Sequence, residues 1–182
     1  MPLIPWEPTW DVKNQSFDAT CARSGWADWL VEGIEKLFTD FELDGLYFDG
    51  TSEAMRCQIH LHGCGWKDED GQLHNTFAVL AVRKMMRRIA EVVRRHRPDA
   101  ILDVHMSSSL TLPTLSFCDS YWDGEQFESF TSADDFELPL DAFRTEFMGA
   151  NWGVPADMLY YMLHDYRKGT GLALLHAVPV RA

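Results

Sequence analysis

Acidic side chains follow two short apolar segments of this sequence. Asp49 ends the alternating run 44–49 (DGLYFD), and Asp123 and Glu125 end a second run within 115–125. Asp fits poorly inside a strand, so an acid at a strand end either caps a turn or serves a site. Two carboxylates in different environments can cleave a glycosidic bond, because one protonates the leaving oxygen while the other stabilises or attacks the oxocarbenium-like centre.

Residues suited to binding a sugar accompany these acids along the chain. Aromatic side chains offer apolar faces to sugar rings, and imidazoles offer hydrogen bonds. The candidates of this kind are Tyr47, His105, Tyr121, Trp122, Trp152 and His176. Each of them alone also fits a turn or a core position, but together they favour a carbohydrate site with Asp49, Asp123 and Glu125 as its catalytic residues. We prefer Glu125 as the general acid and Asp123 as a residue that orients the substrate, and the reverse assignment stays open.

Helical and strand-like patterns alternate along the chain and must position these residues. Strands are predicted at 44–49, 100–108, within 115–125 and at 171–180. Helices are predicted at 24–41, 77–97, 140–150 and 155–168. The inner stripe of the second helix is expected to hold Phe77, Leu80, Met85, Ile89, Val92 and Val93.

This alternation predicts an α/β fold of parallel strands joined by right-handed crossovers. The strands belong either to a doubly wound sheet or to part of a β/α barrel. In both architectures ligands bind at the carboxyl ends of the strands. We therefore expect the acids and histidines at these ends to meet at one edge of the sheet. They are Asp49, His105 with Asp103, then Asp119, Asp123 and Glu125, and His176.

Composition limits the class of partner. The 182 residues are 46% hydrophobic, which is enough for a packed core in a single domain over residues 1–182. The formal net charge of −12 opposes binding to nucleic acid or to an anionic membrane. No apolar run reaches the roughly 18 residues of a membrane span. The expected partner is an uncharged small molecule, here a carbohydrate substrate.

Five segments together carry a resemblance to a known family. They are DGLYFDGT, LHGCGWKDEDGQLH, ILDVHMSS, SYWDGEQF and FRTEFMGANWGVP. The chain resembles bacterial glycoside hydrolases of the family 123-like type, which implies a (β/α) barrel of the TIM type and glycosidase activity. Family 123 is a β-N-acetylgalactosaminidase family with an adjacent Asp-Glu pair, whereas this chain has Asp123-Gly124-Glu125. By analogy with barrel α-glycosidases, Asp49 would be the nucleophile and Asp123 the acid.

The predicted elements amount to half of a barrel. A complete barrel has eight βα units and about 250 residues, whereas four units are visible here. We therefore expect a partial barrel from a longer enzyme, with unpaired strand edges that favour self-association.

Two other functional classes fit some of the same residues. A carbohydrate-binding barrel without catalysis would use the aromatic residues alone. A metal-dependent hydrolase would use the loop that holds Cys57, His60, His62 and Cys64. Zinc sites usually draw two pairs of ligands from separated segments, and this loop is one short segment. We therefore expect no metal and no cofactor, and free thiols at all four cysteines.

Overall fold

The computed structural model describes residues 20–50, 53–106, 110–125, 140–147, 153–159 and 166–181. These residues divide into two compact units. The first unit comprises residues 20–42 and 53–96, and the second comprises residues 43–50 and 97–181. The expectation of a single domain stays a prediction, and each unit is described here by itself.

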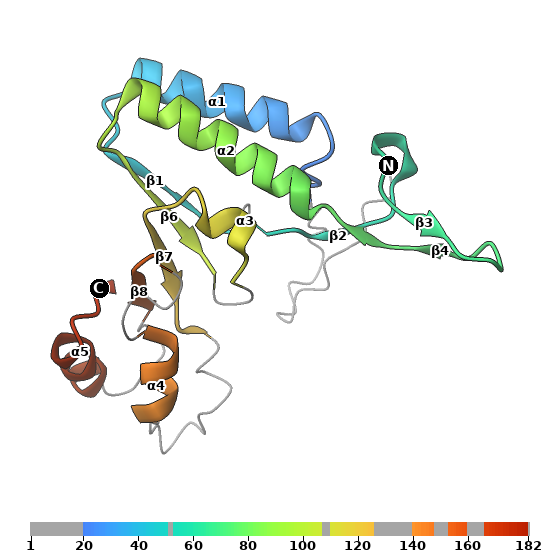
Figure 1. Cartoon of the computed structure of the whole chain (residues 1–182). Helices are drawn as coiled ribbons and strands as arrows, with labels where there is room; N and C mark the ends of the chain where they lie inside the picture. The colour runs from blue at the N-terminus through green and yellow to red at the C-terminus, as the bar shows by residue number, and fades with distance from the viewer. Residues whose placement is uncertain are drawn as a thin grey trace, which may run out of the picture. The chain divides into compact units, whose positions relative to one another are not determined.

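Two amphipathic helices dominate the first unit. Helices α1 (Trp26–Asp40) and α2 (Val79–His96) lie side by side (Figure 1). Both bury an apolar stripe at helical spacing, which in α2 consists of Val82, Met85, Met86, Ile89, Val92 and Val93. Ion pairs also join the helices: Arg88 lies 2.5 Å from Asp28 and Arg95 lies 3.1 Å from Glu35.

Two residues assigned to the inner stripe of α2 are exposed instead. The side chains of Phe77 and Leu80 are 64% and 79% exposed. Phe77 precedes the helix and pairs with Arg56 in a short ladder. Leu80 is two residues before the buried Val82, and residues two apart on a helix lie on nearly opposite sides. The prediction was therefore wrong at the helix start and correct from Met85 onward.

In the first unit, the residues that precede α2, from 53 to 78, form short secondary-structure elements rather than a plain loop. Strands β2 (Arg56–Cys57) and β5 (Thr76–Phe77) pair in antiparallel fashion, as do β3 (Trp66–Lys67) and β4 (Leu73–His74). A single 3-10 turn, η1 (His60–His62), lies between β2 and β3.

A parallel sheet organises the second unit. Its strands are β1 (Gly45–Phe48), β6 (Ile101–His105), β7 (Ser120–Asp123), β8 (Ala156–Leu159) and the two-residue β9 (Val180–Arg181), in that spatial order. The connections hold α3 (Leu112–Leu115), α4 (Leu140–Phe147) and α5 (Tyr166–Leu175) (Figure 1). The predicted α/β class with parallel strands is confirmed. No closed barrel is found among the described strands, because β1 and β9 each pair with one neighbour there.

The last two predicted elements were wrong. Residues 156–159 form strand β8 where a helix was expected, and α5 extends to Leu175 and covers the first half of the expected strand 171–180. Both segments are short and have apolar side chains at successive positions. In such a segment the periodicity is the same for a buried strand and a buried helix.

The two faces of the sheet differ in polarity. In-register neighbours Phe48, Val104, Tyr121 and Ala156 lie on a buried face. The other face is partly buried and more polar, and we call it the polar face; its residues are Tyr47, Asp103, His105, Ser120, Trp122 and Asp157. Side chains alternate along a strand, so each face is set by the register. Across the ranges that the structure describes, no helix is long and apolar enough to cross a membrane.

Candidate functional site

A chain of hydrogen bonds joins three strands at their carboxyl ends. The Tyr47 hydroxyl lies 2.7 Å from His105 Nδ1, and His105 Nε2 lies 2.9 Å from Glu125 Oε2. An ionised carboxylate can only accept, so Nε2 carries the proton that is donated to Glu125. In the neutral imidazole Nδ1 then accepts from the Tyr47 hydroxyl. The arrangement holds the orientation of His105, and it sets this tautomer when Glu125 is ionised and the imidazole is neutral.

The Trp122 ring completes the surroundings of this chain. It packs edge-on against Tyr47 and His105, with ring centroids 5.1 Å and 5.3 Å away. The His105 side chain is 12% exposed, whereas that of Glu125 is 37% exposed. His105 is thus shielded while the Glu125 carboxylate can meet a bound molecule. We call Tyr47, His105, Trp122 and Glu125 the rim cluster.

Asp49 directly follows β1 and is exposed. It lies one residue beyond Phe48, at the carboxyl end of the strand that carries Tyr47. Gly50 follows with a φ of 66°, which turns the chain immediately afterwards. Its catalytic role stays a prediction.

Asp123 lies on the opposite side of the sheet from the rim cluster. It is 1% exposed, and its Oδ1 accepts a hydrogen bond of 2.7 Å from the Gly124 amide. β7 ends at Asp123, and Gly124 has a φ of 125°, so the extended alternation stops there. Asp123 and Glu125 therefore do not share one face, as they would if residues 123–125 were extended.

Tyr121 also belongs to the buried face and not to a sugar-binding surface. Its side chain is fully buried, and within the described part of the chain its hydroxyl has no hydrogen-bond partner. Burial, with the nearby charges of Asp123 and Glu146, raises the pKa of Tyr121 to about 12. The pKa of Glu146 on α4 is raised by burial and then by the charge of Asp123. The sequence patterns did not predict that the carboxylates of Asp123 and Glu146 and the hydroxyl of Tyr121 influence one another's ionisation.

His176 does not belong to the rim cluster. His176 lies in the turn after α5, where its Nδ1 lies 2.8 Å from the Leu172 carbonyl oxygen and Arg144 Nε lies 3.4 Å from Nε2. His176 was expected at the carboxyl end of a strand. It instead lies before β9. Trp152 lies outside the described residues.

Asp157 is a polar-face residue that the sequence did not predict. It pairs in register with Trp122. The only available signal was a strand at 156–159, and that segment was assigned to a helix.

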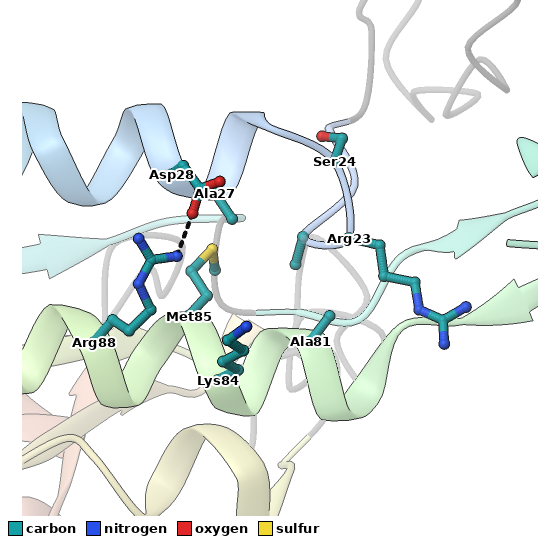
Figure 2. A pocket seen from close by; sticks show the side chains of 9 residues that line it. Arg23, Ser24, Ala27, Asp28, Ala81, Lys84, Met85 and Arg88 are labelled. Carbon is teal, nitrogen blue, oxygen red and sulfur yellow. Dashed lines mark hydrogen bonds and ion pairs between the residues drawn. The ribbon is translucent and has the colours of Figure 1, made fainter. Parts of the chain in front are cut away.

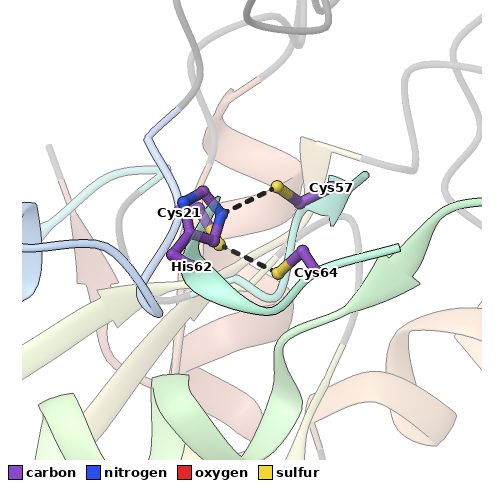
Figure 3. Close-up of side chains that lie close together, drawn as sticks. All are labelled: Cys21, Cys57, His62 and Cys64. Carbon is purple, nitrogen blue, oxygen red and sulfur yellow. Dashed lines mark hydrogen bonds between the residues drawn. The ribbon is translucent and has the colours of Figure 1, made fainter. Parts of the chain in front are cut away.

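A second cluster of chemically active side chains lies in the first unit. Cys21, Cys57, His62 and Cys64 bring one ligand atom each to within 4.8 Å of one another (Figure 3). We call this group the Cys3His cluster. It differs from the predicted set because Cys21 replaces His60, which is exposed. All four cysteines are free thiols, as expected.

A pocket of about 220 Å³ lies between the turn that precedes α1 and the first half of α2 (Figure 2). Its charged lining residues are Arg23, Asp28, Lys84 and Arg88. Arg88 and Asp28 pair with each other there. The pocket contains no residue of the rim cluster or the Cys3His cluster.

The chain matches no protein-family model, no curated protein and no solved structure. A functional proposal therefore depends on the side chains of the two clusters.

Proposed function

We propose that the protein is a glycoside hydrolase and that the polar face is part of its active site. The observation that supports this most is the hydrogen-bonded chain from Tyr47 through His105 to Glu125. It holds a carboxylate beside aromatic rings at the carboxyl ends of parallel strands, where ligands bind in such folds. This proposal also retains the resemblance to family 123-like enzymes.

The proposed roles follow from exposure and contacts. Glu125 is the general acid: His105 holds one of its oxygens, and the other oxygen is accessible and, when protonated, can donate its proton to the leaving oxygen. Asp49 is the second carboxylate and stabilises or attacks the oxocarbenium-like centre. His105 is a positioning residue, since it acts through Glu125. Trp122 and Tyr47 supply ring surface for the sugar.

The strand order supports a barrel as the full architecture. Successive strands add in one direction, from β1 through β6, β7 and β8 to β9. A doubly wound sheet reverses this order at its switch point, whereas a β/α barrel does not. The polar face would then line the interior of the barrel mouth.

The test compares matched amide variants on a panel of aryl glycosides. We expect Asp49→Asn and Glu125→Gln to lose roughly 100-fold or more in kcat, since general acids and charge stabilisation each contribute on that scale. Asp123→Asn is the control: its side chain is 1% exposed, so we expect near-normal turnover. Near-normal turnover in the first two variants would contradict the proposal. Sugar binding by the wild-type protein without any hydrolysis would favour the non-catalytic carbohydrate-binding alternative.

A further inference from the structure

We propose that Cys21, Cys57, His62 and Cys64 bind one Zn²⁺ ion in a closed, structural site. The proposal rests on the first unit alone and is independent of the glycosidase proposal. It also reverses the expectation of no metal, because the structure adds a ligand from a separate segment.

The distances between the ligand atoms fit a tetrahedral ion. Cys21 Sγ lies 3.7 Å from Cys64 Sγ, and Cys57 Sγ lies 3.2 Å from His62 Nε2 (Figure 3). Zinc–sulfur bonds of about 2.3 Å in a tetrahedron place neighbouring sulfurs about 3.8 Å apart. A disulfide would require about 2.05 Å between the sulfurs. The observed spacing therefore suits thiolates that share an ion, not a pair of cysteines that are oxidised.

Among the described residues, the apolar core around the cluster is small. Its buried residues are the three cysteines and Ala78, with partly buried Ile59 and Ala81 packed against them. The nearby ladders β2–β5 and β3–β4 have two residues in each strand. So little apolar burial does not order a chain segment by itself, and small structures of this kind are commonly stabilised by a metal. Zinc would supply the missing stabilisation.

The backbone around Cys64 is shaped to present its thiol. Gly63 and Gly65 flank it with φ values of 78° and 80°, a conformation that favours glycine. At Gly65 an added Cβ would also lie 2.9 Å from the Gln58 carbonyl oxygen, so the turn is closely packed. The Cys64 amide donates to the Ile59 carbonyl at 3.1 Å and closes the turn over η1.

Three further hydrogen bonds hold the ligand-bearing segments together. The Thr76 hydroxyl donates to the Cys57 carbonyl at 3.3 Å and accepts from the Gly65 amide at 3.0 Å. The Arg23 guanidinium donates to the Gly63 carbonyl. These contacts join β2, β5 and the Cys21 segment to the turn that holds Cys64, in the way that outer contacts orient metal ligands.

The ligand set selects zinc and a structural role. Soft thiolates with one imidazole in a tetrahedron are typical of structural zinc, whereas calcium and magnesium require oxygen ligands. Iron–sulfur clusters usually take four cysteines, and Rieske centres take two histidines. Four protein ligands fill the coordination sphere, so no position stays open for a reacting water. The metal-dependent hydrolase alternative therefore gains no support from this site.

The experiment measures metal content in protein purified without added metal or chelator. Elemental analysis should find about one zinc per chain. Thiol titration under denaturing conditions with chelator and no reductant should find all four cysteines reduced. No bound metal in the wild-type protein, or a disulfide between Cys21 and Cys64, would overturn the proposal.

A matched pair of histidine variants tests the ligand assignment. His60 and His62 both lie in η1, but only His62 belongs to the cluster. Competition with a chromophoric chelator measures the zinc affinity of each variant. We expect His62→Ala to weaken zinc binding at least tenfold, the scale known for disturbed zinc sites. His60→Ala should leave the zinc affinity unchanged. If His62→Ala does not fold, the visible spectrum of Co²⁺-substituted wild-type protein provides the second measurement. Tetrahedral Co²⁺ with thiolate charge transfer supports the site, and octahedral Co²⁺ without it contradicts the proposal. Equal zinc affinity in both histidine variants would also contradict it.

Discussion

Tyr47→Phe and Tyr121→Phe delete the same hydroxyl group from two strands of one sheet, and we expect opposite effects on stability. The Tyr47 hydroxyl lies 2.7 Å from His105 Nδ1, and the His105 side chain is only 12% exposed. Its deletion removes a net hydrogen bond and leaves a shielded acceptor unsatisfied. The expected loss is about 1–2 kcal/mol of unfolding free energy.

The Tyr121 hydroxyl is buried and has no hydrogen-bond partner among the described residues. Its desolvation is therefore uncompensated, and its deletion should gain about 1 kcal/mol. The two variants should thus differ by about 2–3 kcal/mol although the chemical change is identical.

Urea unfolding followed by far-UV circular dichroism measures this difference. With an m value of about 2–3 kcal/mol per molar, the midpoints of the two variants should differ by about 1 M. Equal midpoints, or a less stable Tyr121→Phe variant, would refute the assignment of the two hydroxyls. Unchanged m values serve as the control that both variants unfold from the same native state.

Three further substitutions test the sheet and the buried acids. Gly45→Ala would place a Cβ 2.3 Å from the Ile101 carbonyl oxygen, so we expect thermal unfolding to show a loss of about 1–3 kcal/mol in the free energy of unfolding. Gly33→Ala in α1 has open space around the added Cβ, so this variant should gain about 0.5–1 kcal/mol. Equal effects of the two glycine substitutions would contradict the β1–β6 register. The pKa of Glu146 is raised in the folded protein, so the native state binds more protons than the unfolded chain. The free energy of unfolding should therefore fall as the pH rises from the ordinary glutamate pKa through the raised pKa. Glu146→Gln should remove this decline and raise the melting temperature at neutral pH, and a variant with the wild-type pH profile would contradict the raised pKa of Glu146.

Long amphipathic elements were predictable from the sequence. The stripes of α1 and α2 repeat at helical spacing over 15 and 18 residues, and β1 and β6 alternate between apolar and polar side chains. The parallel arrangement followed from the alternation of strands and helices. By contrast, β8 and α5 depend on which side chains the neighbouring strands bury, and periodicity does not contain that information.

The residues of the site were predicted better than their arrangement. His105 and Glu125 were both candidates, but their contact depends on Gly124, whose φ of 125° turns the chain after β7. The same turn separates Glu125 from the buried Asp123. In the Cys3His cluster, Cys21 contacts Cys64 across 43 residues of sequence, a contact that no local spacing rule predicts. Tertiary contacts therefore determine which residues come together in both clusters.

The role of Glu125 as general acid is tested most directly by the dependence of hydrolysis on the leaving group. The measurement is the ratio of kcat/KM for Glu125→Gln to that of the wild-type protein, on one aryl glycoside with an activated leaving group and one with a poor leaving group. A general acid matters most for the poor leaving group, so we expect a loss at least tenfold greater on that substrate. An equal loss on both substrates, or no loss on either, would contradict it.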